Sequence, residues 1–188
     1  MNGFVLIPKK LSEIEGKHRY LDIAVYFTIR CFKCDNTSRI SYEKIVDKLG
    51  ITKKDAIKAV KEMVELKIIS YKQIPSEHNS FKFNEYYFDK ELDQHFEMVG
   101  RDLLEQNLKA KQIGLLIYLK LDSLFGWYRF RDYTELGKKL GCTRQTASKY
   151  IKELSDYIEP SKAGGIHFTN KIFTFKDKQE RTKQTYIL

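Results

Sequence analysis

The chain has 188 residues, of which 42% are hydrophobic and 31% are charged, a composition that excludes disordered and fibrous proteins. Lysine and arginine outnumber aspartate and glutamate by 34 to 25, and the net charge of +9 favours a polyanionic partner, nucleic acid before an anionic membrane surface. Charges interrupt every apolar stretch and the first residues form no secretory signal, so we expect a cytoplasmic protein with no membrane partner.

The first periodic segment is RYLDIAVYFTIRCF at 19–32, which we expect to form the first helix of an N-terminal domain at 1–88. A short amphipathic segment, YEKIVDKLG at 42–50, ends at a glycine suited to the left-handed conformation that closes helices. Thr52 is then a good N-cap for a second, basic helix. This order predicts a helix-turn-helix, in which the second helix reads DNA: a short helix, a glycine, an apolar residue, a threonine and then a basic helix.

Two β-rich stretches at 68–74 and 80–88, around the turn PSEHN at 75–79, predict a wing hairpin. Residues 89–107 have a charged sequence with a narrow apolar stripe, which predicts a linker helix.

The same pattern then returns. With an offset of 91, residues 42–63 align without gaps over 133–154, and nine of the 22 positions are identical. We therefore interpret the chain as a duplication with a C-terminal domain at 108–175, whose first helix is expected at 110–124. Its wing strands are expected at 157–160 and 166–175, around SKAGG, where Gly164 and Gly165 supply the positive φ of a tight turn. Residues 176–188 form a basic tail, whose order or disorder the sequence leaves open.

The predicted fold is mainly α with small β wings (α+β): two tandem winged helix-turn-helix domains from an internal duplication. On the first reading helix we expect Ala56, Val60, Met63 and Val64 to face inward and lysines to face outward, a surface suited to phosphates. On the second, arginine, glutamine and serine face outward and can read bases, so we assign sequence specificity mainly to this domain. The predicted DNA-binding residues are Thr52, Lys53, Lys54, Lys58, Lys61, Thr143, Arg144, Gln145, Ser148, Lys149, Lys152, Lys162 and Lys171. The wing lysines Lys72 and Lys82 are further candidates for backbone or minor-groove contacts.

Other residue patterns predict no active site. Cys31 and Cys34 form a CxxC without a second ligand pair, so we expect one or both thiols to lie beside the core face of the first helix, and we expect no metal. No phosphate-binding, dinucleotide-binding or nucleophile-elbow motif occurs, which predicts a protein that is not an enzyme and has no cofactor. Trp127, with Tyr128 and Phe130, could be a base-stacking platform, but we expect this aromatic cluster to belong to the core.

The opening FVLIPKKL, the helix RYLDIAVYFTIRCF and the unit ISYEKIVDKLGITKKDAIKAVKEMVELKII resemble the N-terminal winged helix of plasmid and phage replication initiators or replisome organisers. The second copy, LKAKQIGLLIYLKLDSL with LGCTRQTASKYIKEL, resembles the same group. The resemblance implies double-stranded DNA as partner, with two winged helices that grip successive grooves of repeated origin sites.

Two alternatives stay open. A transcriptional regulator would read an operator as one chain or as a homodimer, and in either role the protein would meet replication or transcription machinery. A scaffold would use the same winged helices to hold other proteins without binding DNA.

Overall fold

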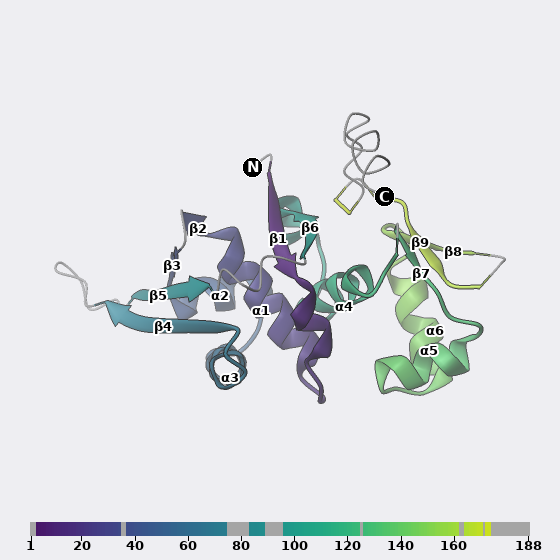
Figure 1. The fold of residues 1–188 in the computed structure, drawn as a ribbon, viewed down its shortest axis with the longest axis horizontal. Helices are drawn as coiled ribbons and strands as arrows, with labels where there is room; N and C mark the ends of the chain where they lie inside the picture. Colours follow the sequence, from purple (N-terminus) through teal and green to yellow (C-terminus); the bar gives the residue numbers. More distant parts are fainter. Residues whose placement is uncertain are drawn as a thin grey trace, which may run out of the picture.

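The computed structural model of the protein describes residues 3–34, 37–74, 83–88, 96–124, 126–161, 164–170 and 172–173. In this part the fold is mixed α+β, with six α-helices and three small antiparallel sheets (Figure 1). The α-helices are α1 (Arg19–Cys31), α2 (Tyr42–Leu49), α3 (Lys53–Glu65), α4 (Ala110–Leu121), α5 (Tyr133–Leu140) and α6 (Arg144–Glu153). None of the helices described is long and apolar enough to cross a membrane.

The strands form three sheets, of which one has two strands and the other two lie one in each repeat. The first sheet pairs β1 (Phe4–Pro8) with β6 (Phe96–Gly100). The second has the order β2 (Lys33–Cys34), β3 (Thr37–Ile40), β5 (Phe83–Phe88) and β4 (Ile69–Ile74). The third has the order β7 (Trp127–Tyr128), β9 (Ile166–Phe168) and β8 (Ile158–Pro160). Two 3-10 helices, η1 (Lys9–Glu13) and η3 (Arg101–Glu105), follow β1 and β6.

The two helix pairs predicted from the repeat are confirmed. α2 ends at Gly50 and α5 at Gly141, with φ of 60° and 65°, the left-handed conformation that glycine adopts without strain. Thr52 and Thr143 then cap α3 and α6, and each hydroxyl accepts the backbone N–H three residues further on. The turn between the helices is therefore specified locally in both repeats.

Both hairpins also form as predicted, with β4 antiparallel to β5 and β8 antiparallel to β9. In the second, Gly164 and Gly165 have φ of 90° and 97°, and a Cβ on Gly165 would lie 2.4 Å from the Tyr128 carbonyl oxygen. These glycines let the hairpin approach the preceding segment closely. The predicted turn at 75–79 lies outside the described residues.

The last strand is shorter than predicted, because β9 ends at Phe168 and not near residue 175. After it, the backbone N–H of Thr169 donates to the Tyr157 carbonyl, and the Asn170 side chain accepts the N–H of Ile172, which bends the chain. The Ile172 carbonyl then accepts the N–H of Gly100, so this segment packs against β6. The predicted tail at 176–188 lies outside the described residues.

The linker helix predicted for 89–107 is wrong. Residues 96–100 are the strand β6, which pairs with β1 in a register that places Val5 opposite Val99, both of them buried. A 3-10 helix follows at 101–105, and residues 89–95 lie outside the described part. These residues form a strand because the N-terminal segment provides its hydrogen-bond partner. This pairing connects residues at opposite ends of the first repeat, and local periodicity does not reveal it.

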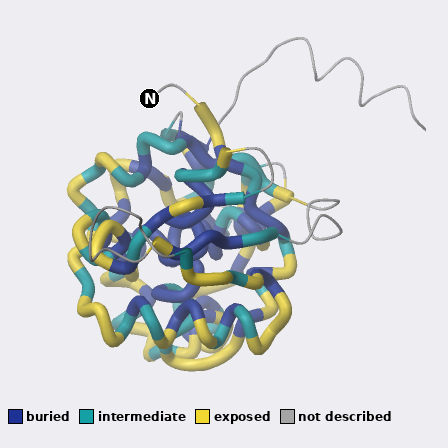
Figure 2. Tube along the Cα trace, turned by 90° about the vertical axis from the view of Figure 1, so that its left-hand side faces the viewer, coloured by how far each residue is buried: buried dark blue, intermediate teal, exposed yellow. Residues whose placement is uncertain are grey.

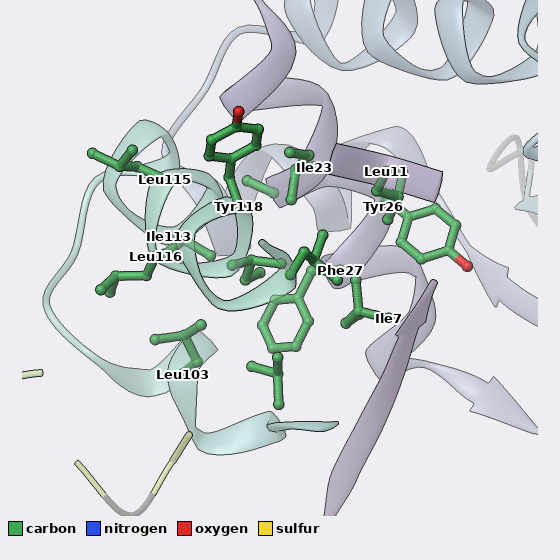
Figure 3. Packing of buried hydrophobic residues seen from close by; sticks show 14 of the residues in the cluster. Ile7, Leu11, Ile23, Tyr26, Phe27, Leu103, Ile113, Leu115, Leu116 and Tyr118 are labelled. Carbon is green, nitrogen blue, oxygen red and sulfur yellow. The ribbon is translucent and has the colours of Figure 1, made fainter. Parts of the chain in front are cut away.

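A single continuous core joins the two repeats, and α1 and α4 pack against each other at its centre (Figures 1 and 3). Phe27 on α1 and Leu116 on α4 are fully buried there. The approach is so close that a Cβ on Gly114 would lie 1.6 Å from the Tyr20 carbonyl oxygen. Buried segments accordingly run through the interior of the trace, and exposed ones lie on its outer turns (Figure 2).

The contact between the repeats is reciprocal. At the start of α1, Arg19 Nη2 donates to the Lys139 carbonyl (3.0 Å) and the Tyr20 hydroxyl to the Leu140 carbonyl (3.2 Å), both at the end of α5. In the other direction, the end of α2 and the start of α4 line one hollow. Equivalent ends of the two repeats therefore lie near each other in both directions.

Candidate nucleic-acid interface

The first predicted reading helix, α3, has the expected faces. Ala56, Val60 and Met63 are fully buried, Val64 is half-buried, and Ala59 joins the inner face, which the sequence analysis missed. The predicted contact residues on the opposite side are all exposed: Thr52, Lys53, Lys54, Lys58 and Lys61. The helix thus presents a lysine-rich face to solvent.

One of these lysines is already paired. The Lys53 ammonium lies 2.6 Å from a carboxylate oxygen of Glu43 on α2. Within the described residues, Lys54, Lys58 and Lys61 form no ion pair with a carboxylate. Three lysine charges on α3 are therefore available to a phosphate backbone.

A buried carboxyl lies beneath this face. Asp22 on α1 is 1% exposed, and one of its carboxylate oxygens has no hydrogen-bond partner in the described part. Burial, with a smaller contribution from Glu62, raises the pKa of Asp22 from 3.8 to about 7, while Lys58 acts in the opposite direction. The charge state of Asp22 near neutral pH is thus linked to α3.

The second predicted reading helix, α6, is also oriented as predicted. Ala147, Ile151 and Leu154 are buried. The predicted contact residues are all exposed: Thr143, Arg144, Gln145, Ser148, Lys149 and Lys152. Lys149 lies 3.7 Å from Glu153, one turn away, a surface pair of little strength. Arg144 and Gln145 stand in the first turn, the end of a reading helix that meets base edges.

The turn that holds α6 is tight. A Cβ on Gly137 of α5 would lie 2.7 Å from the Cys142 carbonyl oxygen, and the N–H of Cys142 donates to the Gly137 carbonyl (2.8 Å). Val46 stands at the equivalent position of the first repeat. The second helix pair is therefore held more closely than the first.

In the first hairpin, an acidic side chain neutralises nearby basic ones. The Glu85 carboxylate on β5 lies 3.1 Å from Lys72 and 2.7 Å from Arg39, and it also accepts the hydroxyl of Tyr87. These contacts, led by Tyr87, lower the pKa of Glu85 to about 2. Lys72 is therefore less available to DNA than its exposure implies. The wing lysines Lys82, Lys162 and Lys171 lie outside the described residues.

The structure also brings together residues that the sequence analysis missed. Trp127, Arg129, Arg131 and Lys139 line a hollow between β7, α5 and the second hairpin. The expectation that Trp127 is core is wrong, because it is 40% exposed, whereas Tyr128 and Phe130 are buried as expected. The signal was present in WYRFR, where Arg129 and Arg131 alternate with Tyr128 and Phe130 as in an extended strand, and Trp127 is in phase with the arginines.

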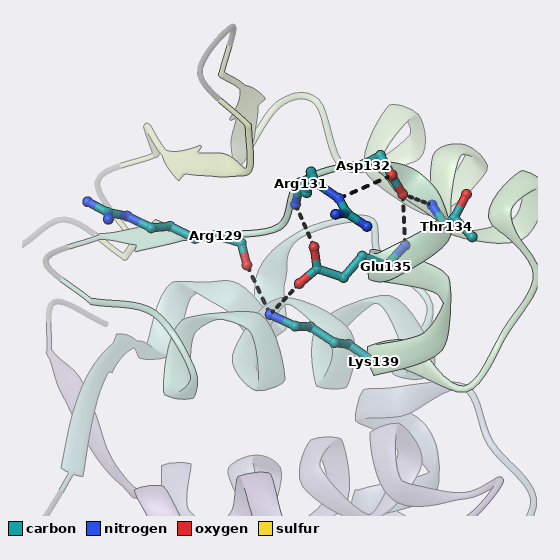
Figure 4. Close-up of polar contacts among 6 residues, drawn as sticks. All are labelled: Arg129, Arg131, Asp132, Thr134, Glu135 and Lys139. Carbon is teal, nitrogen blue, oxygen red and sulfur yellow. Dashed lines mark hydrogen bonds and ion pairs between the residues drawn. The ribbon is translucent and has the colours of Figure 1, made fainter.

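A network of hydrogen bonds fixes this segment to α5 (Figure 4). Asp132 caps the helix, since one of its carboxylate oxygens accepts the N–H groups of Thr134 and Glu135. The Glu135 carboxylate accepts the Arg131 backbone N–H (2.8 Å), and Lys139 donates to the Arg129 carbonyl (3.1 Å). These backbone hydrogen bonds lower the pKa of both Asp132 and Glu135.

The cysteines occupy different environments. Cys31 is buried, Cys34 is exposed and Cys142 is half-buried. Burial raises the pKa of the Cys31 thiol to about 12, so it stays protonated and unreactive at neutral pH. Among the described residues, no group of three or more histidine, cysteine or acidic side chains is placed to hold a metal ion.

Comparison of the chain with known protein families and with curated proteins finds no match. The candidate interface is therefore defined by the geometry of α3, α6 and the hollow beside α5.

Proposed function

We propose that the protein binds double-stranded DNA through two tandem winged helix-turn-helix domains and that it is not an enzyme. The observation that carries the proposal is α6: a threonine-capped helix in a tight turn, whose exposed side combines Arg144, Gln145 and Ser148 with two lysines. Each of these side chain types has a standard contact in the major groove. The antiparallel hairpin that follows each helix pair supports the winged-helix interpretation.

The two domains contribute differently. α3 offers Lys54, Lys58 and Lys61, which suit phosphates and supply affinity without sequence preference. On α6, Arg144 can donate two hydrogen bonds to guanine and Gln145 can pair with adenine. Because α1 and α4 join both domains in one core, α3 and α6 meet the duplex at a fixed separation from each other.

The biological role that we propose is replication initiation at a plasmid or phage-like element, as the sequence resemblance implies. A transcriptional regulator would use the same contacts, and the two roles differ in the target. An origin carries directly repeated sites, whereas an operator is a palindrome or a single site.

The test is selection of the purified protein on a random duplex library at several salt concentrations, followed by sequencing of the retained DNA. We expect one enriched motif and an affinity that falls as salt rises. Enrichment of a motif that the Arg144→Ala variant retains unchanged would contradict the role of α6. Absence of binding even at low salt would contradict DNA binding altogether and favour the scaffold.

A further inference from the structure

The hollow beside α5 carries an exposed aromatic side chain. Trp127, the one tryptophan of the chain, is 40% exposed at the edge of the hollow. Its indole lies against the His167 imidazole of β9, with ring centroids 4.5 Å apart, which holds the ring in place. A large aromatic ring exposed and held in this way is a preformed stacking surface.

The hollow is also basic. Arg129, Arg131 and Lys139 line it, together with one carboxylate, Glu135. Glu135 lies 3.4 Å from Lys139, so Lys139 is largely compensated. The Arg131 side chain is 86% exposed and reaches only to 3.8 Å from Asp132, and the Arg129 side chain extends away from the network (Figure 4). Both guanidinium groups are free to move toward a phosphate.

The indole and the two guanidinium groups lie on one side of the chain. Tyr128 and Phe130 are buried between Trp127, Arg129 and Arg131, so every second side chain points outward. An extended chain separates such neighbours by about 6.5 Å. The side therefore offers one stacking surface followed by two cations.

The first repeat provides an internal comparison. Arg39 alternates with buried Ser38 and Ile40 just as Arg129 does with its buried neighbours, but Arg39 is ion-paired with Glu85. At the position before Ser38, the first repeat has Thr37 and no aromatic ring. Within the described residues, the exposed tryptophan is thus a feature of the second repeat alone, and the two arginines beside it are less strongly paired than Arg39.

We propose that this hollow binds an unpaired segment of nucleic acid, with one base stacked on Trp127 and the adjoining phosphates on Arg129 and Arg131. The segment must be unpaired, because bases within a duplex are already stacked on both faces and cannot cover an exposed indole. The site is separate from α3 and α6, so it goes beyond duplex binding and does not depend on it.

The test uses the fluorescence of Trp127 in the full-length protein. An oligodeoxythymidylate about ten nucleotides long is titrated into the protein, and a base stacked on the indole quenches its emission. An oligouridylate of the same length shows whether DNA and RNA bind alike. We expect saturable quenching by the oligodeoxythymidylate, whereas absence of quenching would overturn the proposal.

Variants locate the site by anisotropy of a labelled oligodeoxythymidylate. Trp127→Ala should weaken binding by about 5- to 150-fold, the range for loss of one base stack, and Trp127→Phe should recover part of it. The double variant Arg129→Ala with Arg131→Ala should weaken binding and reduce its salt dependence. Lys138→Ala, which removes an exposed cation of α5 that does not line the hollow, is the matched control and should bind the oligonucleotide normally.

Competition separates this proposal from duplex binding. The claim of an unpaired ligand would be overturned if a duplex displaced the oligonucleotide completely and if the Trp127 and arginine variants also lost binding to that duplex. Equal oligonucleotide binding by all variants would also overturn it. Binding of the oligonucleotide without binding of any duplex would contradict the proposed function, but it would still support the hollow as a site for unpaired nucleic acid.

Discussion

Replacing Asp22 by asparagine should stabilise the protein at neutral and alkaline pH. Asp22 is buried on α1 beneath α3, and one of its oxygens has no hydrogen-bond partner in the described part. Its pKa of about 7 lies roughly three units above the ordinary 3.8, so ionised Asp22 destabilises the fold. At about 1.4 kcal/mol per unit the upper limit is about 4 kcal/mol, and we expect about 1 to 3 kcal/mol after local relaxation.

The pH dependence has a definite sign. The folded protein holds the Asp22 proton more tightly than the unfolded chain, so wild-type stability falls as pH rises from about 4 to about 7. Asp22→Asn carries no such charge, and its advantage should therefore be small at about pH 4 and largest above about pH 7.

Urea unfolding at a series of pH values measures this difference, and Asp47→Asn is the control. Asp47 lies on the exposed side of α2, where its side chain is 71% exposed, so its replacement should change stability by less than about 0.5 kcal/mol. An advantage of Asp22→Asn that is equal at all pH values, or a loss of stability at about pH 8, would refute the reasoning.

Three further outcomes follow from α6, α3 and the contact between the repeats. Arg144→Ala should reduce binding to the selected duplex by about 1 to 3 kcal/mol and relax the preference at one base, measured by anisotropy on matched and mismatched duplexes. Lys58→Ala should weaken all duplexes alike and lower the slope of log affinity against log salt by about one; a loss confined to one sequence would contradict a phosphate role. Gly114→Ala should destabilise the protein by at least about 3 kcal/mol in urea unfolding, because its Cβ would overlap the Tyr20 carbonyl, whereas Gly3→Ala, with 3.9 Å of space, should change little.

The helix pairs could be predicted from sequence because their determinants are local. Gly50, Thr52, Gly141 and Thr143 fix where each helix ends and begins, and the spacing of apolar residues then fixes which side is buried. The exposure of the predicted contact residues on α3 and α6 follows from the same spacing, and it is confirmed for every one that the structure describes.

The errors arose where a partner distant in the sequence decides the outcome. Residues 96–100 form a strand because β1 lies beside them. The ion pair of Lys72 with Glu85 of the neighbouring strand is likewise invisible to local spacing, although Lys72 stays a candidate for DNA contact. Trp127 is different, because its exposure follows from the local alternation in WYRFR. At this position the alternation along the chain outweighs the general preference of aromatic residues for the core.

The rigid contact between the repeats adds a requirement to the proposed function. Two binding modules on one body gain affinity only where both can be engaged together. In the proposed function, the lysines of α3 would accept any phosphate backbone and the side chains of α6 would discriminate between bases, so neither helix alone would define a target. Because α1 and α4 pack closely where Gly114 meets Tyr20, we expect the separation of α3 and α6 to adjust little to the DNA. Selected duplexes should therefore share one fixed spacing between the base-specific motif and the region contacted by α3, and a change of that spacing should weaken binding even when the motif itself is intact.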